Sequence, residues 1–155
     1  MINWIDILSP KLRQLHQDWI HYRGNFLMPG VTDYNAFASV DAVQDASASS
    51  AAVLLPAEGG PVFKHIGLAL TNIMPDCKPG MRFAELKSPV IRAAVTAPYH
   101  RIVSSRQPDV RRNRGSDGAA DFEMLLLPFC DPRLHVRIIH AVYDLAGIDW
   151  KRAFK

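Results

Sequence analysis

The stretches FEMLLLPF (residues 122–129) and VRIIHAVY (residues 136–143) decide the fold of this chain. Successive side chains of a strand point to opposite faces of the sheet, and in both stretches most residues of either parity are apolar. An antiparallel sheet with one face in water instead alternates apolar and polar residues. The two stretches therefore predict strands that are covered on both faces.

Turn residues divide the carboxyl-terminal part of the chain into three strands. Asp131-Pro132 predicts a turn between strands over Asp121–Phe129 and Leu134–Leu145. A strand over Asp109–Arg114 precedes them, and the glycines of Gly115–Gly118 predict the turn that joins it to the next strand. Three strands joined by short turns form an antiparallel meander.

Two further strands are expected upstream. Gly59-Gly60 lies between the apolar runs Ala51–Leu55 and Pro61–Leu70, which is the pattern of a hairpin. Leu70–Met74 is expected to turn helical, and Asp76–Gly80 to form another turn. The five strands together predict an α+β fold with a five-stranded antiparallel sheet.

The first helix is expected over residues 10–23. Ser9-Pro10 combines a capping residue with a proline at the first helical position, and Gly24 ends the helix. The apolar residues that follow Pro10 fall on one face of this helix and must pack on something: Leu12, Leu15, Trp19 and Ile20.

The second helix is expected over residues 88–106, where Ser88-Pro89 repeats the same start signal. Pro98 lies inside it and predicts a kink or a break. This helix would cover one face of the sheet. The other cover would be the 10–23 helix, a partner chain, or both. Residues 36–52 are rich in Ala and Ser and fit a short helix or a loose connection equally well.

Composition excludes several classes of protein. The chain has 155 residues, 48% of them hydrophobic and 21% charged, which is typical of a globular domain. No run free of charged residues approaches the about 20 residues of a membrane-spanning helix. Met1–Asp6 has no secretion-signal pattern, and two cysteines make no disulfide framework, so we expect a cytoplasmic protein. A net charge of +3 is too small to predict nucleic-acid binding.

Four motifs follow one another with the order and spacing of a known family. With the predicted order of helices and strands, they make the chain resemble a small PAS-type family that is found largely in alphaproteobacteria and often as a stand-alone domain. The motifs lie within Trp19–Asp33, Phe63–Gly67, Pro79–Leu86 and Phe122–Pro128.

The resemblance implies a PAS-like sheet with an N-terminal flanking helix, and a role in sensing or signalling. We expect a flanking helix and linker over residues 1–30, the PAS-like domain over 31–145 and a tail over 146–155. Because few residues follow the last strand, the signal would leave through contact with an unidentified signalling protein. Domains of this type often dimerise through such a helix, so a homodimer is expected.

A small-molecule ligand would bind between the sheet and the helices packed on it. The sequence leaves open which strand parity faces inward, so residues of both parities are candidates. The candidate ligand-binding residues are Phe63, His65, Tyr99, His100, Met124, Leu126, Ile139 and His140. Some PAS domains hold haem through a histidine of the long helix, which makes His100 a conceivable iron ligand; a surface histidine is the plainer interpretation.

Catalysis and metal binding find little support in the motifs. The six histidines and two cysteines show neither HExxH nor CxxC spacing, and no nucleophile elbow is present. We therefore expect no metal site and no enzyme. Two alternatives stay open: a small cavity enzyme that pairs His65 or His140 with a carboxylate, and a ligand-free interaction or dimerisation module.

The arginines around residues 101–114 form the only concentration of positive charge. They fit an anion site, because guanidinium groups bind phosphate well, or a solvated edge strand that resists aggregation. The second interpretation is the simpler one. The residues are Arg101, Arg106, Arg111, Arg112 and Arg114.

Overall fold

The computed structural model describes residues 6–113 and 122–145 and has the predicted α+β architecture. The five strands are β1 (Ser50–Leu54), β2 (Val62–Ile66), β3 (Asp109–Asn113), β4 (Phe122–Cys130) and β5 (Val136–Asp144). They form one antiparallel sheet in the order β2-β1-β5-β4-β3. This arrangement is consistent with a PAS-like fold. The expected turn at Gly115–Gly118 and the tail over 146–155 lie outside the described residues.

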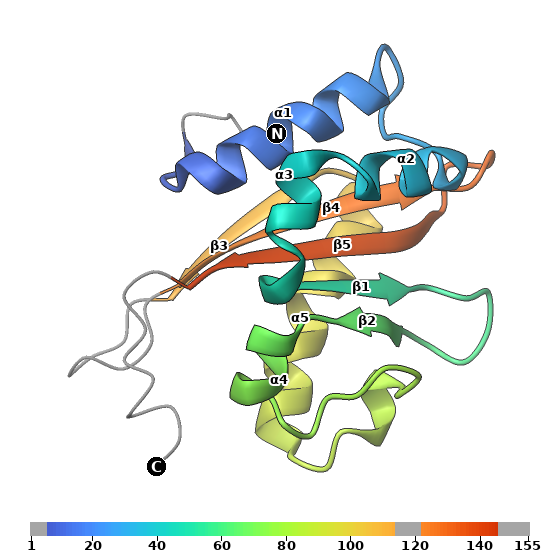
Figure 1. Ribbon diagram of the computed structural model, residues 1–155. Helices are drawn as coiled ribbons and strands as arrows, with labels where there is room; N and C mark the ends of the chain where they lie inside the picture. The colour runs from blue at the N-terminus through green and yellow to red at the C-terminus, as the bar shows by residue number, and fades with distance from the viewer. Residues whose placement is uncertain (1–5, 114–121, 146–155) are drawn as a thin grey trace.

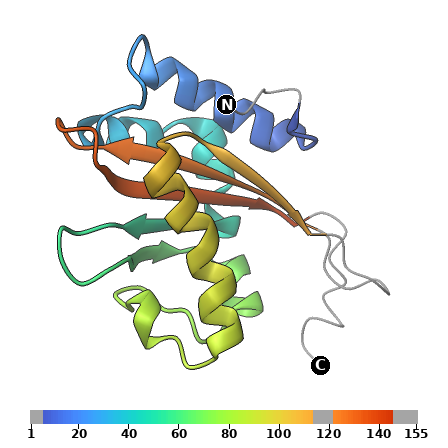
Figure 2. The same ribbon diagram turned by 180° about the vertical axis from the view of Figure 1, so that it is seen from behind.

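Helices cover both faces of the sheet, as the apolar strands predicted. Helix α1 (Pro10–Arg23), together with the short helices α2 (Tyr34–Ala38) and α3 (Asp41–Asp45), lies on one face (Figure 1). Helix α5 (Pro89–Ser105) crosses the opposite face, as the view from behind shows (Figure 2). We call these the α1 face and the α5 face. Helix α4 (Leu68–Ile73) follows β2.

Helix α1 has the predicted ends and most of the predicted apolar stripe, but Ile20, which was expected to pack with it, is 36% exposed. The Ser9 hydroxyl accepts a hydrogen bond from the backbone N–H of Leu12, and Gly24 ends the helix with a positive φ of 58°. Leu12, Leu15 and Trp19 are buried, and the Trp19 indole donates to the carbonyl of Pro128 on β4 at 2.9 Å. The stripe is therefore docked on the chain's own sheet.

Helix α5 begins at Pro89 as expected but does not break at Pro98. Pro98 removes one backbone hydrogen bond, yet the helix continues to Ser105, and Pro98 and Tyr99 are buried. The remaining turns and the packing against the sheet therefore outweigh the single missing bond.

The segment between α1 and β1 resolves into short elements. Helices α2 and α3 come first, and the 3-10 turn Ser47–Ser49 then connects α3 to β1. Gly67 lies against this turn, where a Cβ atom would come within 2.3 Å of the Ser47 and Ala48 carbonyl oxygens.

The hairpin predicted at Gly59-Gly60 is present, and both glycines have positive φ. Among the described residues, no helix is long and apolar enough to cross a membrane.

Candidate functional site

Six of the eight predicted ligand-binding residues lie on the sheet, which divides them between its two faces, and the other two, Tyr99 and His100, lie on α5. Phe63, Met124, Leu126 and Ile139 are buried on the α5 face, and Tyr99 is buried on α5 itself. His140 is buried on the α1 face, and His65 lies on that face but is exposed. Residues separated by a sheet do not line one cavity, so only the first group can share an interior site with α5.

On the α5 face, aromatic side chains connect β2 to the long helix. The Phe63 ring lies 4.6 Å from that of Phe83, which in turn meets the Tyr99 ring edge-on at 5.1 Å. Burial, followed by the nearby Tyr143 and Cys77, holds the pKa of Tyr99 well above its ordinary value. Burial and Cys77 likewise raise the pKa of Tyr143 to about 12. Two phenols and a thiol, all protonated, therefore gather on this face.

The edge of the same face carries charge. Asp109 on β3 lies 3.7 Å from Arg101 on α5 and 3.7 Å from Arg111, two residues along its own strand. These distances exceed a hydrogen bond. The Nε and one terminal nitrogen of Arg111 are buried, and within the described chain neither has a hydrogen-bond partner. Part of the basic cluster seen in the sequence thus turns inward beneath α5.

On the α1 face, the carboxylate of Glu123 ties the start of α1 to the sheet. One oxygen accepts from the backbone N–H of Ser9 at 2.7 Å. The other accepts from the N–H of Leu8 at 3.0 Å and from Nε of Arg112 at 2.7 Å. A negative charge at a helix N-terminus is favourable. Glu123 therefore joins the flanking helix to β3 and β4 at one point, which we call the Glu123 clasp.

His140 is sealed in the same face. Its Nδ1 shares a hydrogen bond of 2.9 Å with the Tyr34 hydroxyl, and the ring of Phe37 packs edge-on against it. Burial, aided by His65, lowers the pKa of His140 to about 4. Its Nε2 has no hydrogen-bond partner among residues 6–113 and 122–145. The imidazole is therefore held neutral.

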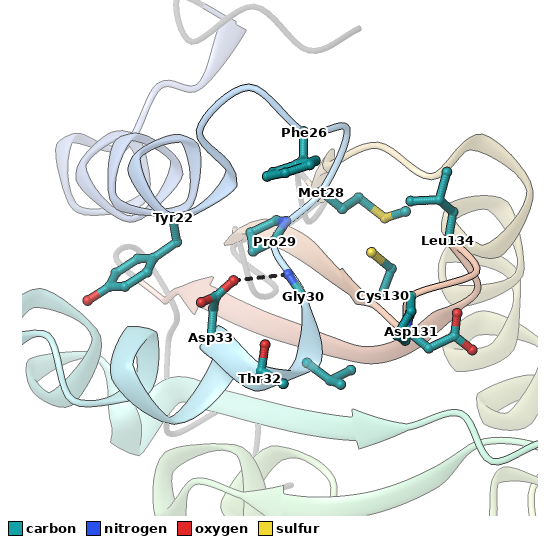
Figure 3. A pocket seen from close by; sticks show the side chains of 12 residues that line it. Tyr22, Phe26, Met28, Pro29, Gly30, Thr32, Asp33, Cys130, Asp131 and Leu134 are labelled. Atoms are coloured by element: carbon teal, nitrogen blue, oxygen red, sulfur yellow. Dashed lines mark hydrogen bonds between the residues drawn. The ribbon is translucent and has the colours of Figure 1, made fainter.

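A groove opens where α1 ends, beside the turn between β4 and β5 (Figure 3). The backbone N–H of Cys130 donates to the Pro29 carbonyl, and that of Gly30 donates to Asp33, which fixes the loop after α1 beside the sheet. The groove has a volume of about 320 Å³. Its lining is Tyr22, Phe26, Met28, Pro29, Gly30, Val31, Thr32, Asp33, Cys130, Asp131, Pro132 and Leu134.

Apolar side chains stand exposed on the rim of this groove. Phe26 is 76% exposed and Leu134 is 40% exposed. Asp131 is fixed at the far side. Burial opposes its ionisation, but hydrogen bonds from His135, Arg137 and Arg133 lower its pKa to about 2. The rim therefore combines an apolar surface with an ionised carboxylate that is paired with Arg137.

The placement of His100 does not fit an iron ligand. Its side chain is exposed on α5, whereas the neighbouring Tyr99 is buried toward the sheet. A haem enclosed between α5 and the sheet would need the opposite arrangement. In the described part of the chain, no group of His, Cys, Asp and Glu residues could hold a metal ion.

Comparison of the chain with protein-family models, with curated proteins and with solved structures gives no match.

Sequence reasoning did not find three features of these sites. The groove joins segments that are distant in sequence and carry no motif. Glu123 is the one charged residue in an otherwise apolar strand. A carboxylate at a buried position is normally paired, so its presence there could have predicted a buried hydrogen-bond or ionic partner. Tyr143 and Arg111 lie beside Met124 on the α5 face, but the sequence does not show which alternate residues of each strand face α5.

Proposed function

We propose that this protein is a PAS-type sensory or signalling domain. It would bind a small ligand on the α5 face and pass the signal to another protein through contact on the α1 face. The sheet order and the crossing of α5 over one face support this proposal by analogy of fold, and a fold hosts many functions. The connection between the two faces of the sheet supports the function more directly.

The Glu123 clasp is the observation that carries the proposal. Arg111 and Arg112 are consecutive on β3 and point to opposite faces: Arg111 toward Asp109 beneath α5, and Arg112 toward Glu123. Glu123 in turn holds the backbone at the start of α1. A ligand that moves the edge strand would therefore alter the hold on the flanking helix, provided that it binds one arrangement better than the other.

The output would be a protein contact at the groove of Figure 3, and a second copy of this chain is the partner that we propose. Exposed apolar residues on a surface mark interaction sites, and Phe26 and Leu134 supply them in the lining of this groove. The stripe of α1 is buried on its own sheet, so a dimer would use this rim and not the stripe.

The cavity-enzyme alternative has less support. It requires His65 or His140 within hydrogen-bond reach of a carboxylate in a wet pocket. In residues 6–113 and 122–145, the hydrogen bond of His140 is to the Tyr34 hydroxyl, and the ring is enclosed by aromatic side chains. The third possibility, an interaction module without a ligand, is an outcome of the experiment below.

Two measurements on the purified full chain test the proposal. Native mass spectrometry and an absorption spectrum report a co-purifying small molecule, and light scattering after size exclusion reports the oligomeric state. We expect a bound molecule and a dimer that the double substitution Phe26→Ser with Leu134→Ser dissociates. Leu68→Ser, at another exposed leucine, is the matched control. A dimer without any ligand would leave only the interaction module, and a ligand-free monomer would contradict the proposal entirely.

A further inference from the structure

We infer that a small pocket between α1 and the connection from α5 to β3 binds a short-chain monocarboxylate, of the size of acetate, beside Arg23 and His16. The pocket has a volume of about 70 Å³. It is a second site, separate from the groove of Figure 3 and from the ligand proposed for the α5 face. Its lining is His16, Trp19, Ile20, Arg23, Leu27, Gln107 and Pro108.

The two polar side chains that α1 contributes to this pocket are incompletely bonded. His16 is only 4% exposed, and its Nδ1 atom is buried without a hydrogen-bond partner among the described residues. The same is true of the Nε atom of Arg23. Buried polar atoms are normally paired, because an unpaired one has lost its bonds with water and gained nothing. The chain therefore leaves these two groups for an occupant of the pocket to satisfy.

Trp19 holds the two polar side chains in place. His16 and Arg23 lie two helical turns apart at one edge of the apolar stripe of α1. The Trp19 ring lies nearly parallel to that of His16 at 6.2 Å, and the Arg23 guanidinium carbon is 5.8 Å from the Trp19 ring centre. Because Trp19 is buried and bonded to the Pro128 carbonyl, the site is built on a fixed element.

The charge of the pocket selects a monoanion. None of its described lining residues is acidic, and none of the ion pairs of the described chain involves Arg23. Asp18 has an unpartnered oxygen of its own, but it does not line the pocket and is bonded to Gln14. Burial, followed by the charge of Arg23, lowers the pKa of His16, so the imidazole is neutral near pH 7. One uncompensated positive charge therefore remains.

The shape of the pocket suits a short carboxylic acid. The N–H groups of a guanidinium match the two oxygens of a carboxylate. Apolar side chains, among them Ile20, Leu27 and Pro108, form the rest of the wall and suit a short hydrocarbon chain. A single water needs about 10–15 Å³, so the pocket is large enough for a molecule of a few non-hydrogen atoms. A phosphate group, with a charge of about −1.5 to −2, would exceed the available positive charge.

The occupant would join two elements that are distant in sequence. Gln107 and Pro108 connect the end of α5 to the start of β3, whereas Arg23 is the last residue of α1. A carboxylate between them would hold the flanking helix to this connection. Hydrogen exchange should therefore slow at the end of α1 and at the Gln107 amide when the acid binds.

Acetate and its neutral isostere acetamide test the inference on the full chain, with sodium chloride keeping the ionic strength constant. The ¹H–¹⁵N signal of the Arg23 Nε–H group and the ring signals of His16 report the contact, and they are assigned by their loss in Arg23→Lys and His16→Gln. We expect acetate to shift both sets saturably and to bind about tenfold more tightly than acetamide, because only the acid makes charge-assisted hydrogen bonds. Sulfate should bind more weakly than acetate.

Variants separate this pocket from general charge. Arg23→Gln should reduce the affinity for acetate about tenfold and leave that for acetamide unchanged. His16→Phe, which keeps a ring beside Trp19 but removes both nitrogens, should also weaken acetate binding. The controls are Arg133→Gln, in the exposed turn before β5, and His21→Gln, at an exposed position of α1; neither should change the affinity. Circular dichroism checks that each variant is folded.

Three outcomes would overturn the inference. Acetate may shift the signals no more than sodium chloride does, which would mean that the pocket holds only water. It may bind Arg23→Gln as tightly as the wild type. It may shift the Tyr99 ring and leave His16 unmoved, which would place the acid on the α5 face. None of these results bears on the oligomeric state or on a co-purifying molecule, so the proposed function is judged separately.

Discussion

The two faces of the sheet bury similar numbers of apolar strand residues but differ in how their polar groups are bonded. On the α1 face, the carboxylate of Glu123 has three donors and the His140 imidazole is bonded to Tyr34. On the α5 face, the Arg111 guanidinium has buried nitrogens without partners, and the Tyr99 phenol is enclosed. The polar groups of the α1 face thus bond mostly within the chain, with Nε2 of His140 as an exception, whereas the Arg111–Asp109 pair of the α5 face is held at 3.7 Å without a hydrogen bond.

The largest effect should come from the aromatic centre of the α1 face. Phe129 is fully buried, and its ring lies 5.1 Å from those of Tyr34 and Phe37. Phe129→Ala should lower the free energy of unfolding by about 3–5 kcal/mol, because it removes a large apolar side chain and leaves a cavity. Urea denaturation measures this, with the exposed Phe26→Ala as the matched control that should change stability by less than about 0.5 kcal/mol. Equal effects at the two sites would contradict the view of this face as a packed core.

Acid should unfold the protein partly through His140 on the same face. Its pKa is about 4 in the folded chain and 6.5 when unperturbed, so the unfolded chain takes up this proton first as the pH falls. The stability that the neutral imidazole contributes is complete above about pH 6.5. It is lost as the pH falls toward 4, by about 3 kcal/mol in all.

Denaturation at several pH values isolates this contribution. His140→Gln should flatten the dependence between pH 6.5 and 4, whereas His21→Gln, at an exposed histidine of α1, should leave it unchanged. An identical pH dependence in His140→Gln and the wild type would show that other groups cause the acid sensitivity.

Removing the charge of the Glu123 clasp should have the next largest effect. Glu123→Gln keeps the shape but loses the ionic contact with Arg112, and its NH₂ group cannot accept from the Leu8 or Ser9 amides. We expect a loss of about 2 kcal/mol. Hydrogen exchange should become faster at the start of α1 and remain unchanged in α5. Glu58→Gln, at an exposed carboxylate in the hairpin loop, is the control; faster exchange over the whole chain would show that the clasp is not local.

Hydropathy and turn chemistry were sufficient to predict most of this fold. The capping pair Ser9-Pro10 and the stop at Gly24 bound α1 where the structure has it, and apolar residues of both parities in β4 and β5 predicted two covers. The short helices α2 and α3 fall where a short helix was only one of two alternatives for residues 36–52, since Ala and Ser carry weak local preferences and tertiary contacts decide. Of the kink or break predicted at Pro98, the break is absent, because the local penalty is outweighed by the rest of the helix.

The sites were harder to predict for a geometric reason. Period-two alternation shows that two faces exist but not which one meets which helix, so His140 and Met124 entered one candidate list although a sheet separates them. The groove of Figure 3 depends on the register of β4 beside Pro29, where a parallel bridge joins Gly30 to Cys130. No local pattern encodes that contact.

The smallest expected effect gives the sharpest contrast between the faces, because it uses the same substitution on each. Tyr34→Phe removes the hydrogen-bond partner of His140 Nδ1 and leaves two unpaired nitrogens in a buried ring, so it should cost about 1–2 kcal/mol. Tyr99→Phe removes a hydroxyl to which none of the described hydrogen bonds leads, and it should change stability by less than about 0.5 kcal/mol or increase it slightly. Urea denaturation of both variants in the ligand-free protein measures the difference. A loss in Tyr99→Phe as large as that in Tyr34→Phe would mean that the phenol of the α5 face is already satisfied within the protein and is not available to a ligand.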